Sequence, residues 1–193
     1  MPPTVVFVTG LAAGTRDVEL VLDFLNTIDL EAGTDVLDDE ENWRRWAVSR
    51  RLAAGRTSAR TGGTRQARVT RTALRRAVGD PDIVPIAGEP AGPVDVDFVD
   101  AGFVDAVLRV RLDQGTPTLA AVDPVGAVLA AATRLAVLGD WERVKICPAD
   151  DCRWAFFDRS RNRSRTWCSM RVCGNREKAR AWRERSRATV SAR

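Results

Sequence analysis

Apolar residues near the start of the chain recur at the spacing of an amphipathic helix. Over residues 17–28 they would share one helix face, which consists of Val18, Val21, Leu22, Leu25 and Ile28. Asp17 stands where a capping residue or a first-turn acid is expected. Residues 41–53 and 66–78 show a similar periodicity and predict two more helices, with a glycine-containing loop over 55–63 between them.

Alternating and continuous apolar runs predict the other elements of the first 142 residues. Residues 4–8 form a β-branched run typical of a short strand, and 94–99 and 103–112 alternate like two strands of a hairpin-like sheet. Residues 124–138 are typical of a buried helix, which Gly139 ends. The pattern therefore predicts an α+β body in which helices dominate and the sheet is small.

The distribution of charge divides the 193 residues into two parts. Residues 143–193 contain 15 Lys/Arg and 5 Asp/Glu, whereas residues 1–142 contain 15 Lys/Arg and 21 Asp/Glu. We therefore expect an N-terminal domain over 1–142 and a small basic module over 143–193. A strongly basic tail on an acidic body favours a polyanionic partner.

A second concentration of arginine lies inside the body. Residues 43–79 contain 11 Arg and no Asp or Glu. Because charge runs usually form solvated faces, we interpret this block as an exposed helical face neutralised by the acids of residues 38–41. Its participation in a binding surface remains the open alternative.

The residue types that are absent exclude several classes of enzyme. The chain has no His and no Tyr, which excludes Ser-His-Asp and Cys-His catalysis and the His-dependent zinc enzymes. Gly10 and Gly14 follow the first predicted strand, but the third glycine of a dinucleotide site and the lysine of a P-loop are missing. We expect a protein that is not an enzyme.

The N-terminal residues lack the charged and apolar regions of a signal peptide, and the uncharged stretch over 124–133 is too short to span a bilayer. The sequence therefore predicts a cytoplasmic protein without a membrane partner, in a compartment that keeps thiols reduced.

All four cysteines lie in the basic module, as two C-x4-C pairs separated by fifteen residues: Cys147, Cys152, Cys168 and Cys173. Paired thiolates at short spacing are typical of tetrahedral zinc, and four of them leave no coordination position for water. The pattern predicts one structural Zn²⁺, which would also supply folding energy to a segment with little core. Two disulfides, unrelated thiols and an iron–sulfur cluster are the alternatives.

Arginine residues surround the second cysteine pair in two periodic rows. In an extended chain, alternate positions would place on one face Arg159, Arg161, Arg163 and Arg165, with Asn162 between them. Residues 174–187 predict a helix with one stripe formed by Arg176, Arg180, Arg183 and Arg187. We expect Val172, Ala179 and Trp182 to pack on the zinc knuckles. The remaining small core would come from Trp154, Phe156, Phe157 and Trp167.

Three segments resemble known families. Cys147-Pro-Ala-Asp-Asp-Cys152 and Trp167-Cys-Ser-Met-Arg-Val-Cys-Gly-Asn-Arg176 closely resemble the CGNR zinc finger, over about residues 143–187. Leu22-Asp-Phe-Leu-Asn-Thr27 resembles the signature of the ABATE domain, which accompanies that finger in a family of stress-induced bacterial transcription regulators. The resemblance implies a zinc-binding, DNA-binding C-terminal module with the four cysteines as its ligands.

The leading hypothesis is a DNA-binding regulator. The two arginine rows would neutralise phosphates, and Arg161, Asn162, Asn175 or Arg176 would reach base edges. Asn175 and Arg176 have the alternative of contacting the cysteine sulfurs or capping the helix. An RNA-binding protein and an adaptor that docks an acidic partner are the competing hypotheses.

Two further expectations concern the body. Asp23 and Asn26 would satisfy buried backbone groups, or would line a ligand pocket if the body is a sensor. A homodimer formed through the body would give a single small finger useful specificity.

Overall fold

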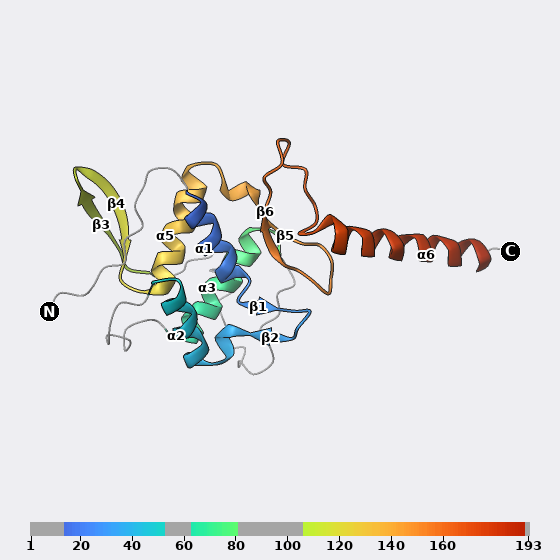
Figure 1. Ribbon diagram of the computed structural model, residues 1–193, viewed down its shortest axis with the longest axis horizontal. Coiled ribbons are helices and arrows are strands. Elements are labelled where there is room, and N and C mark those ends of the chain that lie inside the picture. Colours follow the sequence, from blue (N-terminus) through green and yellow to red (C-terminus); the bar gives the residue numbers. More distant parts are fainter. Residues whose placement is uncertain (1–13, 53–62, 81–105, 192–193) are drawn as a thin grey trace, which may run out of the picture.

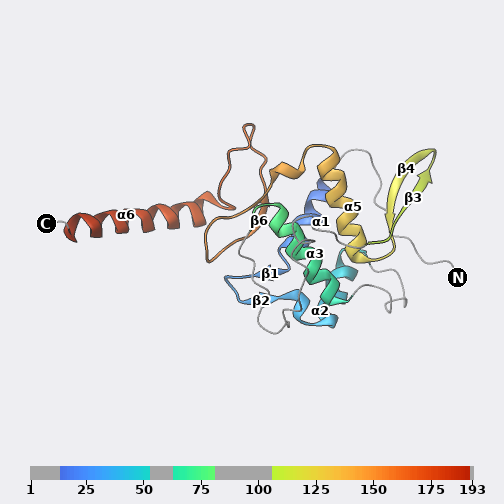
Figure 2. The same ribbon diagram turned by 180° about the vertical axis from the view of Figure 1, so that it is seen from behind.

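The computed structural model describes residues 14–52, 63–80 and 106–191. Helices α1 (Thr15–Leu25), α2 (Glu40–Ser49), α3 (Thr64–Ala77) and α5 (Pro124–Val137) form the body. Three antiparallel hairpins accompany them, and α6 (Asn175–Ser191) projects away from the body with the C-terminus at its far end (Figures 1 and 2). The α+β class and the dominance of helices in the body are as predicted. None of the described helices combines the length and apolar character needed to cross a bilayer.

The core lies between α1 and α5, which pack against each other. Val21, Phe24 and Leu25 of α1 and Val125 and Val128 of α5 are all fully buried. The aromatic residues of α2 close one side of this core. The rings of Trp43 and Trp46 stack with centroids 4.9 Å apart, and both lie about 6 Å from the ring of Phe24.

The four body helices confirm the periodicity, with differences at their ends. Asp17 is a buried first-turn acid that pairs with Arg134, and α1 ends at Leu25, before Ile28 enters a short strand. Asp39 caps α2 by accepting from the backbone N–H of Glu41, and the helix ends at Ser49, short of the predicted residue 53. The φ of Arg51 is 58°, which lies outside the right-handed helical region, so the helix cannot continue through this residue.

The predicted helices 66–78 and 124–138 differ from α3 and α5 by two residues or fewer at each end. The Asp123 side chain accepts from the backbone N–H of Gly126 at 2.7 Å, and Pro124 occupies the first turn of α5. Gly139 follows α5 with a φ of 74°, the left-handed conformation that glycine adopts at a helix end.

One of the three two-stranded sheets contains a strand that the alternation of apolar residues did not predict. Strand β3 (Leu108–Asp113) pairs with β4 (Thr116–Ala121) around a two-residue turn at Gln114 and Gly115, whose φ values are 47° and 85°. The alternation instead predicts that 103–112 pairs with 94–99, and it does not predict β4, because Pro117 and the two alanines that end this strand favour strands weakly. The predicted strands 4–8 and 94–99 lie outside the described residues.

The interpretation of the arginine block as a solvated face is wrong for the inner side of α3. Arg71 and Arg75 are buried. The guanidinium of Arg71 donates to both carboxylate oxygens of Asp35, at 2.6 Å each. Arg75 pairs with the buried carboxylate of Asp80, the residue after the block. Since a buried charge needs a partner, these two acids from outside the block keep the two arginines in the core. Two exposed pairs, Arg44 with Glu41 and Arg68 with Asp38, agree with the expected neutralisation by residues 38–41.

The first two strands of the C-terminal module pack against the hydrophobic core of the body. Strands β5 (Val144–Ile146) and β6 (Ala155–Phe157) form a hairpin that contacts α1. Val144 and Ala155 belong to the main hydrophobic core. A domain boundary at residue 142 therefore remains a prediction, since the hairpin that follows it completes the body's core.

Candidate metal centre and its surroundings

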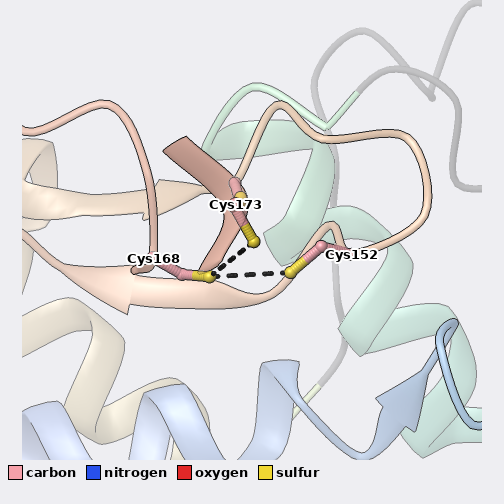
Figure 3. A group of neighbouring side chains, drawn as sticks. Cys152, Cys168 and Cys173 are labelled. Carbon is pink, nitrogen blue, oxygen red and sulfur yellow. Dashed lines mark hydrogen bonds between the residues drawn. The ribbon is translucent and has the colours of Figure 1, made fainter. Parts of the chain in front are cut away.

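The four cysteines converge at the base of α6. Cys147 and Cys152 lie in the connection between β5 and β6, whereas Cys168 precedes the π-helical turn Met170–Gly174 that contains Cys173 and leads into α6. All four sulfur atoms lie within 4.8 Å of one another. The Cys168 sulfur is 3.5 Å from that of Cys152 and 3.6 Å from that of Cys173 (Figure 3).

This sulfur arrangement fits one zinc ion. Four sulfurs about 2.3 Å from a tetrahedral zinc would be about 3.8 Å apart, close to the separations of the cysteine sulfurs. All four cysteines are free, which contradicts the two-disulfide alternative. Because four thiolates complete the coordination shell, the ion would hold the finger together and would have no open position for chemistry.

Backbone hydrogen bonds shape the first pair into a metal-binding knuckle. The backbone N–H of Cys147 donates to the carbonyl of Trp154 at 2.9 Å, which extends the β5–β6 hairpin by one bond. The N–H groups of Cys152 and Arg153 both donate to the carbonyl of Ala149, at 2.9 and 3.0 Å. The resulting turn brings both sulfurs of the pair to one side of the hairpin.

Burial controls the ionisation of the thiols. It raises the pKa of Cys152 to about 11 and, together with the neighbouring thiols, raises the pKa of Cys168 further. At Cys147 burial acts in the same direction, but backbone hydrogen bonds at Cys168 and Ala149 outweigh it, so that the pKa is lowered. A metal that binds these sulfurs as thiolates therefore releases protons.

Arg176 lies beside the metal centre. One of its guanidinium nitrogens, Nη2, is 3.7 Å from the sulfur of Cys173 and 2.8 Å from a carboxylate oxygen of Asp151. The other, Nη1, is 3.7 Å from Glu31 in the connection between β1 (Ile28–Asp29) and β2 (Thr34–Asp35). Asn175 donates from its side chain to the carbonyl of Arg171 at 3.2 Å. Arg176 thus links the second cysteine pair to the first knuckle and to the body.

The segment 158–165 is not extended, so the expected row of four arginines on one face is wrong. Asp158 is fully buried and accepts from the Nζ of Lys145 at 2.7 Å and from the backbone N–H groups of Ser160 and Arg165. Arg163 has a φ of 51°, which turns the chain back on itself. The segment closes around a carboxylate because that buried charge needs several donors.

The four arginines of this loop consequently point to different places. The guanidinium of Arg165 lies 4.8 Å from the ring centroid of Phe156 and donates to the carbonyl of Trp167. Arg163 pairs with Glu142, and Arg159 lies over the ring of Phe157. Arg161 and its neighbour Asn162 are exposed at the loop's tip.

The arginine stripe of α6 divides into two halves. Arg176 contacts Asp151, and Arg180 lies 3.2 Å from Glu177 and 3.8 Å from Asp150. Arg183 and Arg187, further along the helix, are exposed. Arg183 and Arg187 therefore belong to the half of the helix that lies further from the acids near the metal centre.

The expectation that Val172, Ala179 and Trp182 pack on the knuckles is wrong. All three are exposed, Val172 at 54 % and Trp182 at 64 %. The small core near the metal is already filled by Cys147, Ala149, Phe156 and Cys173, with Trp167 packed against it. Trp154, which was also expected there, is 39 % exposed, and Phe157 packs on the body's core instead.

The two candidate pocket residues at the end of the first helix, Asp23 and Asn26, both have protein partners. The Asn26 side chain donates to the carbonyl of Ala155 at 2.9 Å and accepts from the N–H of Ala155 at 2.7 Å. Asp23 pairs with Arg50 at 2.6 Å. The Asn26 side chain thus forms with Ala155 of β6 the pair of backbone hydrogen bonds that a neighbouring strand would otherwise form.

A buried ionic cluster behind the knuckle was not found from the sequence. Arg75 donates to Asp80 at 2.7 Å, to the carbonyl of Leu25 at 2.8 Å and to the carbonyl of Arg153 at 2.6 Å. Arg153 itself pairs with Asp80. Burial and the charges of Arg71 and Arg153 lower the pKa of Arg75 to about 10, so its guanidinium stays charged at neutral pH. Only the spacing of four residues between Arg71 and Arg75, on one side of a helix, hinted at a shared environment.

Comparison with known families agrees with this geometry. Residues 19–158 match the ABATE family model, described as "Putative stress-induced transcription regulator", and residues 143–186 match the CGNR zinc finger. The two matches overlap in the segment that contains the β5–β6 hairpin. No curated protein matches the chain.

Proposed function

The chain belongs to the ABATE family of transcription regulators and ends in a CGNR zinc finger, and on that premise we propose that the finger binds duplex DNA. The observation that supports this proposal is the exposed basic surface of α6. Its exposed cations are Lys178, Arg180, Arg183, Arg185 and Arg187. A helix that stands clear of an acidic body gives a phosphate backbone access to these side chains.

The positions of the ten predicted contact residues suggest different roles. Arg183 and Arg187 are our first candidates for phosphate contacts, because Arg176 and Arg180 lie beside acids. Arg161 and Asn162 at the loop's tip are candidates for base contacts, since their side chains are exposed. Arg159, Arg163, Arg165, Asn175 and Arg176 contact the finger itself and would position the loop and the helix.

Fluorescence anisotropy tests this proposal. Zinc-loaded protein is titrated against a mixed-sequence duplex over a series of salt concentrations, with single-stranded RNA as competitor. The log of the association constant should fall steeply with the log of salt concentration. The joint Arg183→Ala and Arg187→Ala change should reduce the slope by about one for each phosphate that the variant no longer neutralises.

Arg109→Ala is the control, since it removes an exposed arginine from β3, outside both the finger and the arginine block 43–79. Its slope should equal that of the wild type. Flat anisotropy at low salt would contradict DNA binding and favour the adaptor that docks an acidic partner.

RNA binding is the second candidate function, and the exposure of Trp154 favours it. An exposed indole beside a basic surface can stack on an unpaired base. Single-stranded RNA that displaces the duplex, with affinity that Trp154→Ala lowers, would support this candidate over the first.

We also propose that the protein regulates as a homodimer formed through its body and catalyses no reaction. A single finger buries a small surface on DNA, whereas two fingers reading two half-sites gain specificity. Light scattering coupled to size-exclusion chromatography measures the mass. A monomer mass at the concentration where DNA is bound would contradict the dimer.

A further inference from the structure

Helix α6 has an exposed face that the fold leaves without a partner among the described residues. Positions i, i+4, i+7 and i+11 of a helix share one face, and in α6 these are Asn175, Ala179, Trp182 and Ser186. The first three are exposed, and Trp182 has 64 % of its surface accessible. Tryptophan is enriched among the residues that anchor interfaces, so this largely exposed indole is a candidate anchor for a partner.

Charged residues border this face on both sides. Helical periodicity places Arg183 and Arg187 along one border and Lys178 and Arg185 along the other. The acids of the helix, Glu177 and Glu184, fall on the opposite side. The face is therefore a neutral strip between two cationic rows, with the acids kept away from it.

This arrangement matches the cross-section of a DNA groove. A helix in the major groove has base edges in front of it and a phosphate strand on either side. The cationic rows of α6 would face the two strands, and the neutral strip would face the bases. The 17 residues of α6 project from the finger at the metal centre, so that the body does not cover the strip (Figures 1 and 2).

We infer that the strip faces the bases in the major groove of duplex DNA through Ala179, Trp182 and Ser186, with Trp182 packed against thymine methyl groups. The inference rests on the proposed DNA binding and names the residue that reads sequence. An indole offers no hydrogen-bond acceptor to a base, whereas it can cover the C5-methyl group that only thymine presents. Uracil lacks that methyl group, and the deep, narrow major groove of A-form RNA does not admit side chains.

The test compares two duplexes that differ only in methyl groups. One is a mixed-sequence duplex with equal A·T and G·C content, and in the other deoxyuridine replaces every thymine. Zinc-loaded wild-type protein should bind the thymine duplex more tightly, by about fourfold for each methyl group that the indole covers.

Trp182→Ala should bind both duplexes equally, with the affinity of the wild type for the deoxyuridine duplex. Its salt slope should equal that of the wild type, because the indole neutralises no phosphate. Trp182→Phe should retain part of the thymine preference. Val137→Ala, which truncates an exposed apolar residue at the end of α5, should leave the preference intact. Zinc content and circular dichroism confirm that each variant is folded.

The failures of this test are distinguishable. Equal affinity of the wild type for the two duplexes, or a thymine preference that survives in Trp182→Ala, overturns the inference and leaves the proposed function standing. Tighter binding of single-stranded RNA, abolished in Trp182→Ala, overturns it as well, because the indole then stacks on bases. A wild type that binds no duplex at any salt concentration overturns the proposed function, and the inference with it.

Discussion

The guanidinium of Arg75, buried in the body, donates a hydrogen bond of 2.6 Å to the main-chain carbonyl of Arg153, one residue after the metal-binding Cys152. The same guanidinium holds the carbonyl of Leu25 at the end of α1 and the carboxylate of Asp80 after α3. A single side chain therefore joins two body helices to the first zinc knuckle.

Replacing Arg75 by Met should destabilise the whole protein, because it leaves the buried carboxylate of Asp80 with Arg153 as its remaining partner. Loss of one member of a buried ion pair costs about 3–5 kcal/mol. Denaturant unfolding measures this loss, and a colorimetric chelator should remove zinc from the variant faster. Arg76→Met, at the exposed neighbouring position, is the control. Equal zinc release from the two variants would contradict a link between body and knuckle.

Asn26→Ala should loosen the β5–β6 hairpin from α1. The change leaves the N–H and carbonyl of Ala155 without their side-chain partner, at a cost of about 1–3 kcal/mol for each buried group left unsatisfied. Hydrogen exchange at the Ala155 amide should accelerate more than exchange in α5. Asn42→Ala, which removes an exposed hydrogen bond on α2, should leave that exchange rate unchanged.

Zinc affinity should rise with pH. Burial raises the pKa values of Cys152 and Cys168, so zinc must displace protons from both thiols at neutral pH. Competition with a chelator between about pH 6 and about pH 8 should show tighter binding at the higher pH. Complete chelation should unfold the finger and expose Phe156. A pH-independent affinity would contradict four thiolate ligands.

The loop 158–165 should open in acid before the body does. Burial opposes the ionisation of Asp158, but donors on Lys145, Ser160 and Arg165 outweigh it and lower its pKa. A carboxyl group with a lowered pKa in the folded state stabilises above its unfolded pKa of about 4, and the contribution is lost progressively as the pH falls below that value. The protection factor of the Arg165 amide, which compares its hydrogen-exchange rate with that of an unstructured peptide at the same pH, should therefore fall below about pH 4.

Asp158→Asn should lower that protection factor at neutral pH and remove its further fall in acid. Asp140→Asn is the matched control, since Asp140 is half-buried and lies 3.6 Å from Arg143. A neutral-pH exchange rate in Asp158→Asn equal to that of the wild type would contradict the role of the buried carboxylate.

The sequence predicted most of what depends on local periodicity and ligand chemistry. Four body helices, the start of α6 and the four zinc ligands follow from apolar spacing, capping residues and thiolate pairs. The prediction that Val172, Ala179 and Trp182 pack on the zinc knuckles is wrong, because periodicity shows which residues share a face and does not show what that face contacts. The small core beside the metal was already filled by Phe156 and Ala149.

The remaining differences come from partners far apart in the chain. Arg71 reads as a surface residue until Asp35, 36 positions earlier, is brought beside it. Asn26 meets Ala155 across 129 positions. Likewise, alternation of arginine with small polar residues favours an extended strand, until the buried charge of Asp158 draws three donors around itself and bends the loop.

The β5–β6 hairpin also limits how this finger can be inherited. Its Val144 and Ala155 complete the core between α1 and α5, and both family matches include them. If the chain were divided before residue 143, the separated finger would expose the apolar side chains of Val144 and Ala155, and the body would have a cavity in its core. We therefore expect substitutions in the hairpin to be constrained by the body and the finger together, so that the finger would not fold equally well behind an unrelated domain.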